Sequence, residues 1–167
     1  MKESILDGKR ILAVDDEADV LSLLEEEIVG ACRSCTFEKA GTYETAVKRL
    51  ESQDYDLVIL DIMGVRGFDL LSLAVGRGFR VAMLTAHALS PEALKRSFEM
   101  KAMSYLPKEK LGEIVPFLED VLKYEYLTGW KRLMERLKGF FDVKFESEWE
   151  KKTGLPWQEW GKYPKGD

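Results

Sequence analysis

The sequence predicts an α/β protein with a five-stranded parallel sheet and a short C-terminal helical extension rich in aromatic residues. Two observations predict the sheet: short aliphatic runs alternate with helical patterns along the first part of the chain, and several of these runs end abruptly in polar residues. A third observation predicts the extension, because all four tryptophans lie in the last forty residues. The length of 167 residues allows one domain with a small appendage. We therefore divide the chain into residues 1–127 and 128–167.

Five short apolar runs are the expected strands. The run Leu57-Val58-Ile59-Leu60 is unbroken, which is typical of a central strand covered on both faces. The five runs span residues 11–14, 35–40, 57–60, 80–84 and 104–106.

Helical spacing appears in the segments between these runs and after the last one. The first helix carries its apolar residues at Val20, Leu21, Leu23, Leu24 and Ile28. Thr42 and Ser90 are expected N-caps, and Pro91 suits the first helical position. The later helices are expected over residues 42–53, 68–75, 90–100 and 114–126.

The composition is that of a folded, water-soluble protein, with 46% hydrophobic and 33% charged residues. A net charge of −5 argues against a surface that binds nucleic acid non-specifically. No apolar run approaches the roughly 20 residues needed to cross a bilayer, and the start MKESILDGKR lacks the apolar core of a signal peptide. We expect a cytoplasmic protein without a membrane span.

Two cysteines form a lone C-x-x-C motif, which is found in redox pairs and in half of a metal site. A zinc site would need two further ligands, and His87 is the only histidine. We therefore expect Cys32 and Cys35 to be reduced residues in a connection between helix and strand.

Charged and hydroxyl-bearing residues follow the expected strands at their carboxyl ends. Asp15 and Asp16 follow the first strand, Asp61 the third, Thr85 the fourth and Lys108 the fifth. Because the carboxyl ends of parallel strands meet at one edge of the sheet, these side chains are expected to converge. Any one of them alone is equally well explained as a turn or capping residue.

Three converging carboxylates would repel one another unless a cation lay among them. Mg²⁺ suits such a site because it prefers oxygen ligands and often binds one or two carboxylates together with a phosphate oxygen. A lysine and a hydroxyl could contact further phosphate oxygens. The pattern predicts a phosphoryl site with a carboxylate nucleophile, which needs no separate general base.

Residues 8–126 resemble the receiver domain family of bacterial two-component response regulators. The resemblance rests on four motifs, which are Ile-Leu-Ala-Val-Asp-Asp-Glu at 11–17, Val-Ile-Leu-Asp-Ile-Met at 58–63, Leu-Thr-Ala at 84–86 and Tyr-Leu-Pro-Lys at 105–108. It implies a flavodoxin-like, doubly wound sheet with strand order 2-1-3-4-5.

The resemblance also implies roles for the converging acids. Asp61 would accept the phosphoryl group. Asp16 and Asp61 would bind Mg²⁺ directly, Asp15 would bind it through water, and the backbone carbonyl of Met63 would complete the protein ligands.

Four further residues receive roles by the same resemblance. Lys108 would bind the phosphoryl group, and Thr85 with Tyr105 would be the switch pair. His87 would line the approach of the phosphate and, with the residue at Met63, tune its lifetime; the alternative is that this lone loop histidine only faces solvent, which is the commoner case. The surface formed by the helix at 90–100, the strand at 104–106 and the helix at 114–126 would then change.

Partners follow from the resemblance as well. A sensor histidine kinase or a phosphotransfer protein would supply the phosphoryl group, an unidentified protein would read the changed surface, and a homodimer could form. No turnover of an external substrate is expected.

Two departures from the family pattern bear on the site. The loop after Asp61 lacks the usual proline, and Glu109 follows Lys108 where the family has proline. The sequence leaves open whether the peptide between Lys108 and Glu109 is cis, which would cost a few kcal/mol without proline.

Two alternatives remain beside this interpretation. The first is a degenerate receiver that binds protein partners without phosphorylation. The second is an aspartate-nucleophile phosphatase, which is disfavoured because that chemistry needs a second acid where Met63 stands.

The C-terminal extension is expected to form a further helix. Its apolar stripe consists of Trp130, Leu133, Met134, Leu137 and Phe141. It holds no convincing pair of helices for a helix-turn-helix unit, so direct DNA binding is not expected. Packing against the receiver is the favoured role, with partner binding or dimerisation as the alternative.

Overall fold

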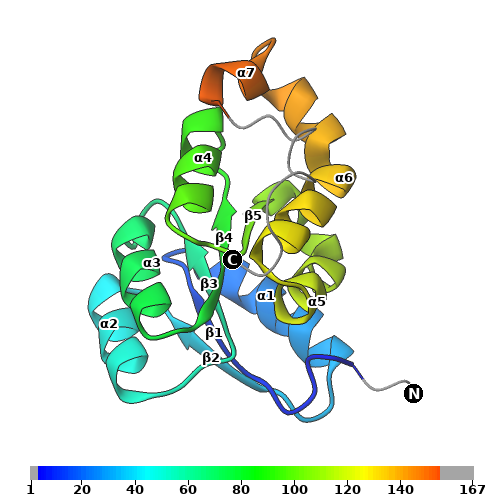
Figure 1. Ribbon diagram of the computed structural model, residues 1–167. Helices are drawn as coiled ribbons and strands as arrows, with labels where there is room; N and C mark the ends of the chain where they lie inside the picture. The colour runs from blue at the N-terminus through cyan, green and yellow to red at the C-terminus, as the bar shows by residue number, and fades with distance from the viewer. Residues whose placement is uncertain (1–3, 155–167) are drawn as a thin grey trace.

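A computed structural model describes residues 4–154 of the chain. Its centre is a parallel sheet of five strands in the order β2-β1-β3-β4-β5, as predicted (Figure 1). The strands are β1 (Arg10–Val14), β2 (Thr36–Ala40), β3 (Leu57–Asp61), β4 (Arg80–Thr85) and β5 (Ser104–Pro107).

Helices cover both faces of the sheet, which makes the architecture flavodoxin-like and doubly wound (Figure 1). Helices α1 and α5 contact each other on one face, and α2 and α3 contact each other on the other. The bounds are α1 (Ala18–Ala31), α2 (Tyr43–Ser52), α3 (Gly67–Gly76), α4 (Pro91–Glu99), the 3₁₀ helix η1 (Lys108–Glu113) and α5 (Ile114–Lys123). The predicted caps are present, because the Thr42 and Ser90 side chains accept hydrogen bonds from Thr45 N and Ala93 N.

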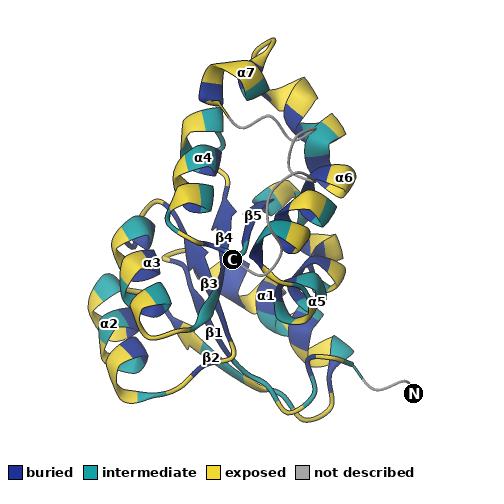
Figure 2. Cartoon of the chain, viewed as in Figure 1, coloured by how far each residue is buried: buried dark blue, intermediate teal, exposed yellow. Residues whose placement is uncertain are grey.

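Strand β3 lies at the centre of the core. All five of its residues are buried, because helices cover both faces and β1 and β4 pair with its two edges (Figure 2). Its unbroken apolar run is therefore explained by its position. Leu23 differs from the expected apolar pattern of α1, since it is 48% exposed on the solvent side of that helix.

A helical pair follows the receiver fold, and it consists of α6 (Tyr126–Lys144) and α7 (Trp149–Thr153). The predicted stripe of α6 is buried, from Trp130 to Phe141, and faces β5 and α5 (Figure 2). One detail of the prediction was wrong: the fifth helix ends at Lys123, and Tyr126 begins α6 after a break in the helix at Tyr124. Trp157, Trp160 and the Pro- and Gly-containing end lie outside the described residues.

The cysteine pair also differs from expectation, because Cys32 and Cys35 are joined in a disulfide. Cys32 ends α1 and Cys35 precedes β2, so the turn brings their Cα atoms to 5.9 Å, within the usual range for a disulfide. The turn is further held by a hydrogen bond from Arg33 N to Asp7 Oδ1 at 2.8 Å.

Within residues 4–154, no helix is both long enough and apolar enough to span a membrane.

Candidate functional site

Acidic side chains from two strand ends form one cluster at the carboxyl edge of the sheet. Asp15 and Asp16 follow β1, and Asp61 is the last residue of β3. Each offers an oxygen that lies within 4.8 Å of those of the other two. Asp15 and Asp61 are buried and Asp16 is exposed, so the cluster has a solvent-facing side. The convergence inferred from the strand ends is present in the structure.

Lys108 reaches this cluster from the loop after β5. Its Nζ lies 2.9 Å from Asp15 Oδ2 and 3.3 Å from Asp61 Oδ1, and its side chain is only 10% exposed. The same Nζ lies 3.2 Å from Glu17 Oε1. Glu17 is not among the predicted site residues, although its place directly after the acid pair was a signal. One ammonium group thus faces three carboxylates.

The charges of the cluster perturb one another. Burial and the negative charge of Asp15 raise the pKa of Asp61 to about 6, although the positive charge of Lys108 acts in the opposite direction. Burial likewise raises the pKa of Asp15. Burial disfavours the charged form of Lys108, but its contacts with Asp15 and Asp61 outweigh this effect and raise its pKa. The site therefore carries uncompensated negative charge.

Two observations show that this residue set fits a divalent cation. Asp15 Oδ2 is buried and receives no hydrogen bond from any described residue, because Lys108 Nζ approaches it at 2.9 Å outside hydrogen-bonding geometry. Gly64 leaves room for the Asp16 carboxylate, since a Cβ there would lie 2.5 Å from Asp16 Oδ2. Carboxylate oxygens are ligands that Mg²⁺ prefers. Asp16 and Asp61, with Asp15 beside them, would hold such an ion.

The loop after Asp61 has no proline, and its backbone conformation depends on two glycines. Gly64 adopts a φ of +89°, which other residues rarely adopt. At Gly67 a Cβ would meet the Asp61 carbonyl oxygen, and Gly67 N donates to Ile62 O at 3.0 Å. Met63 lies in this loop with its side chain 52% exposed. Its assignment as a backbone ligand stays a prediction.

The predicted switch residues are connected through a single backbone position. Thr85 ends β4, is buried, and accepts a hydrogen bond from Ala88 N at 2.9 Å. Tyr105 in β5 is fully buried, and its hydroxyl donates to Ala88 O at 2.7 Å and accepts from Ser90 N at 3.1 Å. Thr85 and Tyr105 therefore hold the two peptide groups that flank the Cα atom of Ala88.

The remaining expectations concern the rim. His87 lies on the surface with a side chain that is 74% exposed, and its Nε2 is 3.9 Å from Glu17 Oε1. Its tuning role stays a prediction. The peptide between Lys108 and Glu109 is trans, because the chain has no cis peptide among the described residues. The loop instead passes directly from β5 into the 3₁₀ helix η1.

Comparison with known proteins agrees with this geometry. The family model of the response regulator receiver domain matches residues 11–118. The chain belongs to the response regulator receiver domain family. No curated protein sequence matches it.

Solved receiver structures are similar over the same part of the chain. The response regulator protein TrrA from Thermotoga maritima, in complex with Mg²⁺–BeF, is 31% identical with a TM-score of 0.58, over 68% of this chain and 99% of that one. A CheY-like response regulator receiver domain protein from Methanospirillum hungatei is 25% identical with a TM-score of 0.57, over 69% of this chain and 96% of that one. The similarity in each case covers about two thirds of this chain.

Proposed function

We propose that this receiver domain accepts a phosphoryl group on Asp61, with Mg²⁺ bound by Asp16 and Asp61 and, through water, by Asp15. The observation that carries the proposal is the gathering of three carboxylates round one largely covered lysine at the carboxyl edge of the sheet. A pKa of about 6 for Asp61 leaves most of this carboxylate ionised at neutral pH, as a nucleophile requires.

The transfer would take place from a phosphohistidine on a sensor kinase or a phosphotransfer protein. An Asp61 carboxylate oxygen forms a bond to phosphorus while the bond from phosphorus to the histidine nitrogen breaks. Lys108 Nζ, 3.3 Å from Asp61 Oδ1, would neutralise one phosphoryl oxygen. The Thr85 hydroxyl would donate a hydrogen bond to another. When bound, Mg²⁺ would neutralise further negative charge on the phosphoryl oxygens.

The product would act as a signal and not as a step in turnover of an external substrate. A conformational change in the phosphorylated chain would be read by a downstream protein, and no direct DNA contact is part of the proposal. The proposal places the chain in the cytoplasm with its kinase.

The test is labelling of the purified chain by radioactive acetyl phosphate, with Mg²⁺ or with excess EDTA. We expect label only with Mg²⁺, and none in Asp61→Asn. Asp69→Asn is the matched control, because Asp69 is an exposed acid at the start of α3 that pairs with Arg66. Label that persists in Asp61→Asn, or no label in the wild-type chain, would rule out the proposal.

A further inference from the structure

The surface formed by α4, β5 and α5 is covered by the chain's own helical pair. Phe98 of α4 contacts the rings of Tyr126 and Trp130, at centroid distances of 5.1 and 5.4 Å. Trp130 Nε1 also donates to Ala102 O at 2.8 Å, in the turn between α4 and β5. The contact is therefore well packed and includes a buried hydrogen bond.

The other two elements of this surface contact the helical pair as well. On β5, the Tyr105 ring lies 5.9 Å from that of Phe141, which is fully buried. On α5, Asp120 Oδ2 lies 3.5 Å from both Arg132 Nε and Arg136 Nη2. The helical pair thus contacts all three elements at once.

We propose that the helical pair, residues 126–153, is a built-in ligand of the α4–β5–α5 surface and that phosphorylation of Asp61 weakens its attachment. This inference rests on the proposed function, because it gives the phosphoryl group an internal reader. A downstream partner would then meet the surface only after the pair has moved.

A continuous path of contacts connects the phosphoryl site with α7. Thr85 accepts from Ala88 N, Tyr105 donates to Ala88 O, and the Tyr105 ring lies against Phe141. Phe141 in turn contacts the ring of Trp149 in α7, at a centroid distance of 6.1 Å. A change at Thr85 therefore reaches the helical pair through packed groups at each step.

The direction of the effect follows from the hydrogen bonds of Ala88. If the Thr85 hydroxyl turns to a phosphoryl oxygen, Ala88 N loses its acceptor, and Ala88, whose carbonyl oxygen accepts from Tyr105, loses one of the two hydrogen bonds that fix its position. Tyr105 then loses a hydrogen bond while buried, which favours repacking of its ring against Phe141. The phosphorylated state should bind the helical pair less well than the unphosphorylated one.

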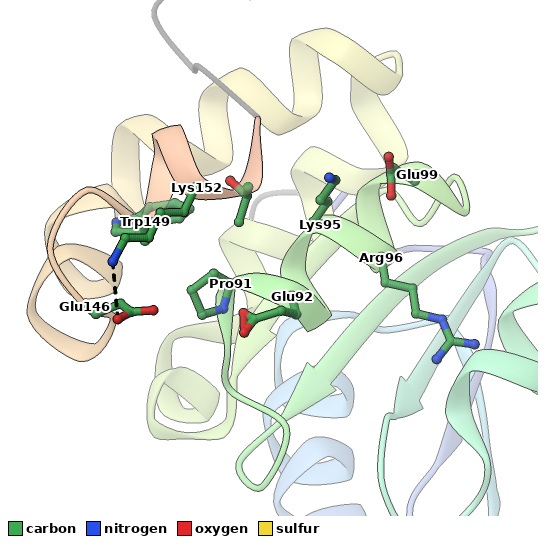
Figure 3. Close-up of a pocket in the computed structure, with 9 residues that line it drawn as sticks. Pro91, Glu92, Lys95, Arg96, Glu99, Glu146, Trp149 and Lys152 are labelled. Carbon is green, nitrogen blue, oxygen red and sulfur yellow. Dashed lines mark ion pairs between the residues drawn. The ribbon is translucent and has the colours of Figure 1, made fainter.

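A pocket lies at the contact between α4 and α7. Its volume is about 400 Å³, and its wall includes both charged side chains and the Trp149 ring (Figure 3). Lys152 Nζ forms an ion pair with Glu146 across 3.3 Å, within the helical pair itself. Pro91 and Glu92 line the pocket from the first turn of α4, directly after the loop that holds Ala88. A shift of that loop would therefore act directly on the contact between α4 and α7.

Hydrogen exchange followed by mass spectrometry tests the inference on the full chain. Mg²⁺ with beryllium fluoride serves as the phosphoryl mimic, as in the TrrA complex. We expect exchange in peptides from residues 126–144 to become faster by about fivefold or more, a coupling of the usual size, while peptides from α2 stay unchanged. Asp61→Asn should show no change. Unchanged or slower exchange in α6, with the mimic bound, would overturn the inference.

The coupling between the two sites is reciprocal, which supplies a second measurement. A substitution that weakens the attachment of the helical pair must also make the chain bind the phosphoryl mimic more tightly. Asp120→Asn removes the partner of two arginines without leaving a cavity, and Phe141→Leu trims the contact with Tyr105. Each variant should bind beryllium fluoride about fivefold more tightly than the wild-type chain. Val143→Ala is the control, because Val143 lies on α6 but is 82% exposed.

The two proposals fail in different ways. If the mimic does not bind and acetyl phosphate does not label Asp61, the proposed function fails and the inference falls with it. If both occur but the affinities of the Asp120→Asn and Phe141→Leu variants equal that of Val143→Ala, only the internal ligand is refuted.

Discussion

Asp61→Asn should make the metal-free protein more stable, because it removes a buried negative charge that has too few partners. Asp61 is 4% exposed and lies beside Asp15, with Lys108 shared among three carboxylates. Its pKa is about 6 in the folded protein against an ordinary value of 3.8. At about 1.4 kcal/mol for each pKa unit, the folded state loses about 3 kcal/mol when Asp61 ionises.

The sign of the pH dependence follows from this raised pKa. Between about pH 4 and 6 the folded state binds more protons than the unfolded state, so stability falls as pH rises through that window. The destabilisation is complete above about pH 7, is about half as large at pH 5, and is absent below about pH 3. Part of the stability gained by removing the Asp61 charge is lost again in the variant, because Lys108 loses one of its partners. We therefore expect a net gain of about 2 kcal/mol at pH 8.

Urea unfolding in EDTA, followed by circular dichroism at pH 8 and pH 5, measures the difference. A gain of about 2 kcal/mol corresponds to a rise in Tm of roughly 4–8 °C for a chain of this size. Mg²⁺ should stabilise the wild-type chain more than the variant, because it binds the folded state through Asp61. The Asp69→Asn control should change neither value. Equal or lower stability of Asp61→Asn at pH 8 without metal would refute the electrostatic reasoning.

Three further substitutions test separate parts of the structure. Gly64→Ala places a Cβ 2.5 Å from Asp16 Oδ2 at a φ of +89°, so calorimetry should show Mg²⁺ binding weakened by about tenfold or more. Gly76→Ala is the control and should not weaken binding, because a Cβ at Gly76 would meet no atom within 4 Å. Lys108→Met removes the only cation beside Asp61 among the described residues, so labelling by acetyl phosphate should be lost. The pKa of Asp61, followed by NMR of its carboxyl carbon, should rise above about 6 for the same reason. Trp130→Phe leaves the Ala102 carbonyl without the indole donor and should cost about 1–3 kcal/mol in urea unfolding; an unchanged value would contradict the docking of α6.

The sheet and the acid cluster were predictable because they depend on local patterns. Each strand is a short apolar run, and the order of the strands, implied by the family resemblance, places the ends of β1 and β3 side by side. Asp15, Asp16 and Asp61 then meet whatever the loops do. The position of Lys108 follows for the same reason, since it leaves the last strand at the same edge.

Features that depend on tertiary contacts were not predictable in the same way. Leu23 fits the helical period of α1, but no element within residues 4–154 covers it, so it stays exposed. The junction of Thr85 and Tyr105 at Ala88 depends on the path of the loop after β4, which has no sequence signature. The covering of α4, β5 and α5 by α6 likewise requires knowledge of how the chain turns after Tyr124. The amphipathic stripe of α6 indicated that it would be buried, but not against which surface.

A crystal structure of the chain with Mn²⁺ and beryllium fluoride tests the central claim most directly, because Mn²⁺ can be located by its anomalous scattering. The account predicts one ion in contact with both Asp16 and Asp61, beryllium bonded to an Asp61 oxygen, and fluorine atoms in contact with Lys108 Nζ and Thr85 Oγ1. An ion at another place, or beryllium fluoride away from Asp61, would contradict it.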